Sequence, residues 1–109
     1  MNWTVEFLPE ALKDWKSLSG NQAAMVGKAI DRVQTNPLPA SEGGYGKPLG
    51  NKNGRNLSGM LKIKLRDAGI RIVYRLIKTD TRMIIVVIGV RADDEVYDAA
   101  LKRREKYGL

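Results

Sequence analysis

The 109-residue sequence contains no cysteine and no histidine. Without cysteine, the chain has no disulfide bonds, no thiolate nucleophile and no thiolate ligands for a structural zinc ion. Without histidine, it lacks the commonest metal ligand and the side chain that most often acts as a general base near neutral pH. Any catalysis must therefore use other groups, and we expect neither a metal nor a cofactor.

Long apolar segments are absent as well. The longest uninterrupted apolar run, Met83–Ile88, has the length of a strand, whereas a membrane-spanning helix needs about 20 predominantly apolar residues. Residues Asn2–Phe7 alternate between polar and apolar and lack the charged and apolar regions of a secretory signal. These features predict a cytoplasmic protein without membrane association. The chain length suits one domain, residues 1–109.

Acidic residues are in the minority, because 19 Lys and Arg stand against 12 Asp and Glu and give a formal net charge of +7. Such a charge favours encounter with an anionic partner, and nucleic acid is the first candidate. A scattered basic surface would be the ordinary explanation. However, several of the cations are concentrated in the segment Leu61–Arg75. This segment is the strongest indication of function in the sequence.

Leu61–Arg75 alternates between apolar and basic residues on either side of Ala68-Gly69, the pattern of a β-hairpin. Because successive strand side chains point to opposite faces, the cations would share one face of the hairpin. The predicted cross-strand pairs are Arg66 with Arg71, Lys64 with Val73, and Lys62 with Arg75. Like charges that face each other across two strands are destabilising. We therefore expect a partner to cover this face.

The remaining sequence predicts an α+β domain. Residues Leu38–Gly59 are rich in glycine and indicate a long surface loop. We expect an N-terminal strand and a helical hairpin packed on a mainly antiparallel four-stranded sheet, with a C-terminal helix. The expected elements outside the hairpin are a strand at Trp3–Phe7, a helix from Pro9 that stops at Gly20, a helix from Asn21 to Asn36, a buried strand at Met83–Val90, and a helix that Asp93 or Asp94 caps.

RNA strand cleavage suits a basic chain without histidine. A ribose 2′-hydroxyl attacks the adjacent phosphate, negative charge develops on the phosphoryl oxygens, and the leaving 5′-oxygen takes up a proton. Arg offers a planar fork to phosphate oxygens and Lys a compact point charge. The cations that would stabilise this charge are Lys62, Lys64, Arg71 and Arg91. The group that removes the 2′-hydroxyl proton stays open between the two lysines and Tyr97, and Tyr97 has a second role open to it, the stacking of a splayed base.

Five further cations are candidates for contact with the RNA backbone. Three lie in the predicted glycine-rich loop and two on the hairpin, and solvated surface charge is the alternative interpretation for each. These residues are Lys47, Lys52, Arg55, Arg66 and Arg75.

Three parts of the sequence carry a resemblance that extends over nearly the whole chain. They are Glu10–Trp15, the hairpin residues Lys62–Arg66 and Gly69–Tyr74, and Arg91 followed by Glu95–Tyr97. In this combination the chain resembles the RelE family of bacterial toxins from type II toxin–antitoxin systems. The resemblance implies a microbial ribonuclease fold, entry into the ribosomal A site, and mRNA cleavage there without metal that leaves a 2′,3′-cyclic phosphate.

The resemblance also implies roles by position. It places the functional lysines at Lys62 and Lys64, the phosphate-binding arginine at Arg71, the arginine that stabilises or protonates the leaving group at Arg91, and the stacking or proton-transferring tyrosine at Tyr97. The implied partners are a cognate antitoxin, RelB-like or of another kind, the 70S ribosome and mRNA. Operator DNA would be contacted only indirectly, through the antitoxin complex.

Two features depart from the family pattern. Asp93 stands where the best-known member has a basic residue, and the glycine-rich loop before the hairpin is longer. The same fold occurs in ParE toxins, which inhibit DNA gyrase and generally lack this catalytic set. The alternatives to an mRNA endoribonuclease are therefore a non-catalytic gyrase inhibitor and an inactive antitoxin-binding module that acts in operator regulation.

Overall fold

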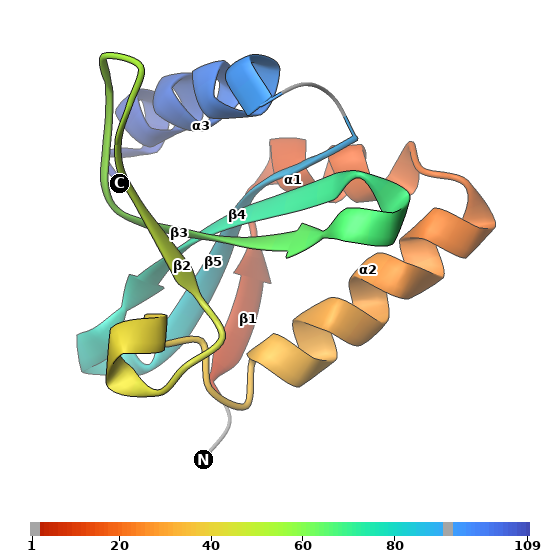
Figure 1. Cartoon of the computed structure of the whole chain (residues 1–109), viewed down its shortest axis with the longest axis horizontal. Helices are drawn as coiled ribbons and strands as arrows, with labels where there is room; N and C mark the ends of the chain where they lie inside the picture. The colour runs from red at the N-terminus through yellow and green to blue at the C-terminus, as the bar shows by residue number, and fades with distance from the viewer. Residues whose placement is uncertain (1–2, 91–92) are drawn as a thin grey trace.

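The computed structural model describes residues 3–90 and 93–109 and shows a five-stranded sheet that packs between helices (Figure 1). The strand order is β1-β5-β4-β3-β2, in which β1 pairs parallel to β5 and every other pair is antiparallel. The elements in chain order are β1 (Thr4–Phe7), α1 (Pro9–Lys16), α2 (Gly20–Val33), β2 (Lys47–Lys52), β3 (Arg55–Leu65), β4 (Ile70–Ile77), β5 (Arg82–Gly89) and α3 (Asp93–Tyr107). The predicted α+β fold is confirmed, with one strand more than expected.

The two N-terminal helices begin where local chemistry favours a start. Pro9 is the first residue of α1, a position at which its fixed backbone angle is pre-organised for a helix. The hydroxyl of Ser19 caps α2 by accepting a hydrogen bond of 3.2 Å from the backbone N–H of Gln22. The prediction that Gly20 ends the first helix is therefore wrong, because Gly20 is the first residue of α2. In the described part of the chain, no helix has the length and apolar character needed to cross a membrane.

The predicted loop Leu38–Gly59 contains β2 and the first part of β3, so this prediction is wrong. Asn53 and Gly54 connect the two strands, with φ angles of 53° and 82°. Positive φ at both central residues is the geometry of the tight hairpin turn for which Asn-Gly is preferred. The glycine-rich composition of the segment concealed this local signal.

The β3–β4 hairpin forms where expected, but in a different register. A single 3₁₀ turn, Arg66–Ala68, followed by Gly69 at φ 65°, joins the strands. The observed pairs are Lys64 with Arg71, Lys62 with Val73, and Met60 with Arg75. The predicted pairing is wrong because Arg66 starts the turn instead of extending the strand. Between β3 and β4, Lys64 and Arg71 are the one pair of like charges that the described register directly opposes.

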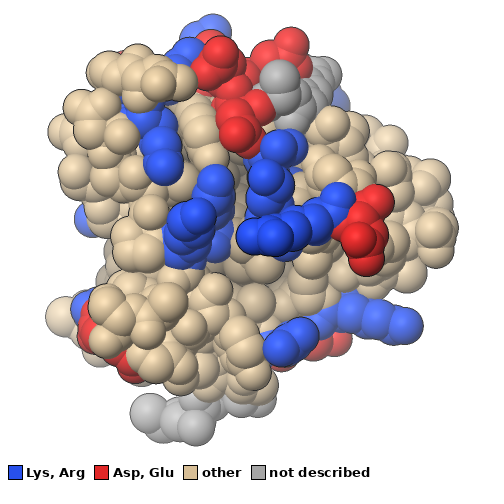
Figure 2. All heavy atoms as spheres, viewed as in Figure 1, with Lys and Arg blue, Asp and Glu red and all other residues tan. Residues whose placement is uncertain are grey.

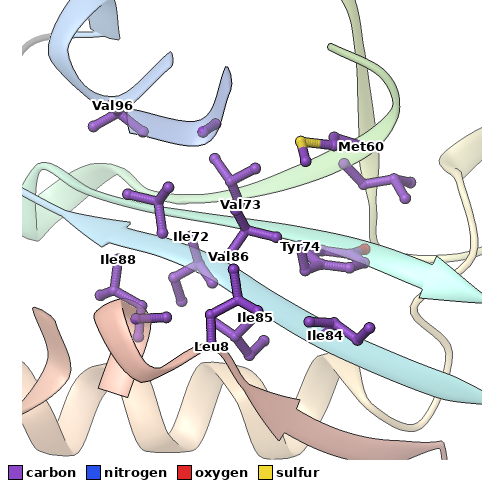
Figure 3. Packing of buried hydrophobic residues seen from close by; sticks show 14 of the residues in the cluster. Leu8, Met60, Ile72, Val73, Tyr74, Ile84, Ile85, Val86, Ile88 and Val96 are labelled. Carbon is purple, nitrogen blue, oxygen red and sulfur yellow. The ribbon is translucent and has the colours of Figure 1, made fainter. Parts of the chain in front are cut away.

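The hydrophobic core lies on both faces of the sheet. In β5, the residues Met83–Ile88 are all buried, and this strand lies between β1 and β4. Figure 3 shows Val96 of α3 above the sheet and Leu8 on the opposite side. The prediction that the continuous apolar run is an internal strand covered on both sides is confirmed.

Hydrogen bonds and ion pairs outside the core connect helix α3 to α1. Arg103 donates to Asp14 at 2.6 Å and to the carbonyl of Val86 at 2.9 Å. At the end of α3, Lys106 and the hydroxyl of Tyr107 donate hydrogen bonds of 2.9 Å and 2.7 Å to the carboxylate of Glu10 on α1. These contacts hold α3 across the sheet, with its first turn close to the β3–β4 hairpin.

The contacts of Glu10 predict acid sensitivity at this end of α3. The hydrogen bonds from Lys106 and Tyr107 lower the pKa of Glu10 from 4.5 to about 2. Because the folded-state pKa is depressed, the stabilisation is fully present above pH 4.5 and is lost as the pH falls toward 2. Thermal melting over this pH range should show a steeper loss for the parent than for Glu10→Gln. Parallel curves for the two proteins would show that the contact does not contribute.

Candidate active site

The β3–β4 hairpin brings two of the predicted site cations face to face. Lys64 on β3 is directly opposite Arg71 on β4, and Lys62 lies two residues before Lys64 on the same face of the strand. Lys64 is exposed, whereas Arg71 is partly buried. The strand pairing therefore fixes the spacing of a lysine and an arginine that could act on one anion.

Lys62 and Tyr97 form a buried pair between β3 and α3. The Lys62 Nζ donates a hydrogen bond of 2.8 Å to the Tyr97 hydroxyl oxygen and lies 5.5 Å from the centre of the tyrosine ring. Lys62 is 8% exposed and Tyr97 is 3% exposed. The hydrogen bond compensates for the removal of these polar groups from water. It also aligns the lysine with a hydroxyl that could exchange protons with it.

The burial of Tyr97 bears on the two roles that the sequence left open. A base stacks on an aromatic side chain only if a ring face is accessible, and Tyr97 is almost wholly enclosed. In this conformation, the contact with Lys62 favours proton transfer or positioning for Tyr97 rather than base stacking.

Arg71 has an acidic neighbour from α3. Its Nε forms an ion pair with the carboxylate of Asp93, the first residue of the helix, and the two side chains are 16% and 48% exposed. The negative charge offsets the repulsion between Arg71 and Lys64, which face each other across the strands. Some of the charge compensation expected of a partner protein is thus supplied within the chain.

Four predicted cations line one hollow on the surface, which we call the basic cleft. It has a volume of about 250 Å³ and is lined by Tyr45, Lys47, Lys62, Ile63, Lys64 and Arg66. Lys47 on β2 is directly opposite Lys62 on β3, which explains why a residue of the supposed loop reaches the hairpin. Figure 2 shows Lys and Arg side chains gathered over the strands, with acidic side chains next to them near α3. The arrangement suits a phosphate-bearing ligand.

The structure separates other predicted cations from the basic cleft. Arg55 is bound to α3, with Nε 2.5 Å from Asp98 and Nη1 3.4 Å from Asp94, and its guanidinium lowers the pKa of Asp98. Lys52 is paired with Arg55 at the end of the β2–β3 hairpin. The guanidinium of Arg75 lies over Gly59 and lines another hollow. Arg91 lies outside the described residues.

The site thus combines a cationic surface with a buried lysine–tyrosine pair. Preorganised cations stabilise an anion most strongly where water is partly excluded, and both Lys62 and Arg71 are largely covered. This arrangement could stabilise a developing phosphoryl negative charge and move a proton nearby.

The chain matches a known protein family over most of its length. A family model described as "ParE toxin of type II toxin-antitoxin system, parDE" matches residues 5–95. The chain belongs to the ParE toxin family. The chain is also similar to the mRNA interferase toxin RelE of Escherichia coli K12, with 29% identity over 103 residues that cover 94% of this chain and 98% of that protein. The predicted resemblance to RelE toxins is confirmed.

Solved structures of RelE proteins are similar to this chain over most of their length. A mutant of the Escherichia coli toxin RelE in the free state has a TM-score of 0.71 and 27% identity, and the match covers 94% of this chain and 98% of that one. A chain of the Mycobacterium tuberculosis toxin–antitoxin complex RelBE2 has a TM-score of 0.65 and 26% identity, and the match covers 84% of this chain and 100% of that one. The fold is therefore that of RelE toxins.

Sequence reasoning missed two residues next to the site. The sequence marks Asp93 as a candidate helix cap and as a departure from the family pattern, whereas in the structure it is the ion-pair partner of Arg71. Tyr45 lies in the segment whose composition indicates a loop, but in the structure it lines the basic cleft. The Asn53-Gly54 dipeptide is the sequence signal that predicts a tight turn here, and with it the pairing of β2 with β3 beside the β3–β4 hairpin.

Proposed function

We propose that this chain is the toxin of a type II toxin–antitoxin system and acts as a ribosome-dependent, metal-independent mRNA endoribonuclease in the cytoplasm, with residues 1–109 forming one toxin domain. The observation that carries the proposal is the assembly of Lys62, Lys64 and Arg71 beside Tyr97 on one hairpin and one helix. The similarity to proteins named mRNA interferase RelE supports the same activity.

In the proposed reaction, the ribose 2′-oxygen forms a bond to phosphorus while the bond from phosphorus to the 5′-oxygen breaks. The 2′-hydroxyl proton passes to a deprotonated base, which is the neutral amine of Lys62 or Lys64 or the phenolate of Tyr97. The leaving 5′-oxygen takes up a proton from Arg91 or from solvent. Arg71 and Lys64 stabilise the charge on the phosphoryl oxygens, and Arg91 serves the leaving group. The products are a 2′,3′-cyclic phosphate and a 5′-hydroxyl.

The proposed partners follow from the same assignment. Several similar structures are complexes of RelE with RelB-type antitoxins, which supports a cognate antitoxin for this chain. An acidic or amphipathic antitoxin segment would cover the basic cleft and block RNA. The 70S ribosome and mRNA are the partners of the active toxin, and operator DNA is contacted only through the antitoxin.

Two parallel assays test this function. Purified chain added to a cell-free translation system should stop protein synthesis and fragment the translated mRNA, while DNA gyrase continues to supercoil plasmid DNA. Inhibited supercoiling with intact mRNA would instead support a gyrase inhibitor, the activity associated with ParE toxins. The retention of the lysine, arginine and tyrosine set favours the nuclease.

The ion pair between Arg71 and Asp93 predicts a gain of RNA affinity. RNA phosphate must compete with the Asp93 carboxylate for the guanidinium, so Asp93→Asn should bind a non-cleavable single-stranded oligonucleotide about 2- to 5-fold more tightly at low salt. Fluorescence anisotropy measures this affinity. Asp93→Glu retains the carboxylate and should bind like the parent.

Glu105→Gln is the matched control for this prediction. It removes one negative charge from the same helix, about 18 Å further along at 1.5 Å per residue, and Glu105 is exposed. An equal gain of affinity for Glu105→Gln and Asp93→Asn would show that net charge, and not the Arg71 ion pair, is responsible.

A further inference from the structure

Tyr45 presents an accessible aromatic ring beside the basic cleft. Tyr45 lies two residues before the start of β2 and is 47% exposed. The ring lines the basic cleft and also an adjoining groove of about 460 Å³ between α2 and β3. An exposed aromatic ring next to a cluster of cations is the arrangement with which proteins bind single-stranded nucleic acid.

A cation from α2 helps to orient this ring. The guanidinium carbon of Arg32 lies 5.0 Å from the ring centre of Tyr45, within the range of a cation–π interaction. The contact limits the rotation of the tyrosine side chain. The ring therefore has a preferred orientation before any ligand arrives.

The backbone that carries Tyr45 is held in place on both sides. The Tyr45 N–H donates to the carbonyl of Asn36 at 3.0 Å, and the Gly46 N–H donates to the carbonyl of Leu38 at 3.0 Å. A Cβ atom at Gly44 would collide with the Leu38 backbone, and one at Gly46 would collide with the Tyr74 hydroxyl. The close packing permits only glycine at these positions. A ring on such a backbone loses little conformational freedom when a ligand binds.

The exposed ring of Tyr45 contrasts with the ring of Tyr97, which is enclosed between β3 and α3. We propose that Tyr45 stacks a nucleobase of single-stranded RNA whose phosphates lie in the basic cleft. This inference rests on the proposed function in taking RNA as the substrate. It assigns base contact to Tyr45, while Lys47 and Lys64, which line the same cleft, contact the phosphates.

The test compares variants of Tyr45 in binding a 2′-O-methyl oligoribonucleotide, which lacks the attacking hydroxyl. Tyr45→Leu removes the aromatic ring but keeps an apolar side chain, and it should weaken binding about 5-fold or more. Tyr45→Phe retains the ring and should bind like the parent. Thermal melting of each variant verifies that the fold is intact.

Salt dependence distinguishes stacking from phosphate contact. The slope of log affinity against log salt concentration should be unchanged in Tyr45→Leu, because no charge is lost. Lys47→Ala should reduce the magnitude of this slope by about 0.7 for a single strand. A reduced slope in Tyr45→Leu would overturn the assignment.

An oligonucleotide of equal length and charge with abasic central positions provides the decisive comparison. The parent should bind it as weakly as Tyr45→Leu binds the normal oligonucleotide, and Tyr45→Leu should cause no further loss on the abasic strand. If Tyr45→Leu binds the normal strand like the parent while ribosomal mRNA is still cut, this inference fails and the proposed function stands. If the abasic effect is found but no mRNA is cut, the proposed function fails and the base-binding role remains.

Discussion

Replacing Arg71 by alanine is expected to lower the rate of mRNA cleavage on the ribosome by about 100-fold or more. Arg71 is opposite Lys64 on the hairpin and largely covered, so its guanidinium would act on a phosphate with little competition from water. The loss of one preorganised donor to a developing oxyanion costs about 10²- to 10³-fold in rate. Single-turnover cleavage of ribosome-bound mRNA measures the effect.

Two variants make the Arg71 prediction specific. Lys16→Ala removes one exposed positive charge from α1 and should cleave at the parental rate. Arg71→Lys keeps the charge but loses the planar fork, so its rate should fall between the parent and Arg71→Ala. Expression of Arg71→Ala in cells at parental toxicity would contradict the role assigned to this residue.

Replacing Lys62 by methionine is expected to lower cleavage by about 10²- to 10⁴-fold, the usual contribution of a proton-transferring group. The methionine fills much of the volume of the lysine stem but cannot donate to Tyr97. The buried Tyr97 hydroxyl then loses its observed partner, which costs about 1 to 3 kcal/mol of folding free energy. Chemical denaturation and single-turnover cleavage measure the two effects separately.

A double variant separates catalysis from stability at this position. Lys62→Met with Tyr97→Phe removes both polar groups, so the free energy of unfolding should recover toward the parental value. Cleavage should remain as low as in Lys62→Met. Recovery of cleavage together with stability would mean that Lys62 has only a structural role.

The sequence predicted the parts of the fold that depend on local pattern. The alternation of apolar and basic residues over Leu61–Arg66 identified the first hairpin strand, and the unbroken apolar run Met83–Ile88 identified the buried strand β5. The register of the hairpin was not predictable from alternation, because Arg66 fits equally well at the end of a strand or at the start of a turn. The difference of two residues kept the same face and changed every partner.

Contacts between distant segments were beyond sequence reasoning. The pairing of Lys47 with Lys62 depends on the β2–β3 turn, and the contact of Asp93 with Arg71 depends on how α3 lies across the sheet. Acidic residues at a helix start are common because they complement the helix dipole. Their presence therefore did not reveal that one of them would meet a site arginine.

The most direct measurement is a map of mRNA ends after the purified chain is added to ribosomes with a defined codon in the A site. A cut within the A-site codon, with a 2′,3′-cyclic phosphate on the upstream fragment and greatly reduced cutting by Arg71→Ala, is the predicted result. Ribosome-bound chain with intact mRNA, or equal cutting by the parent and Arg71→Ala, would contradict it.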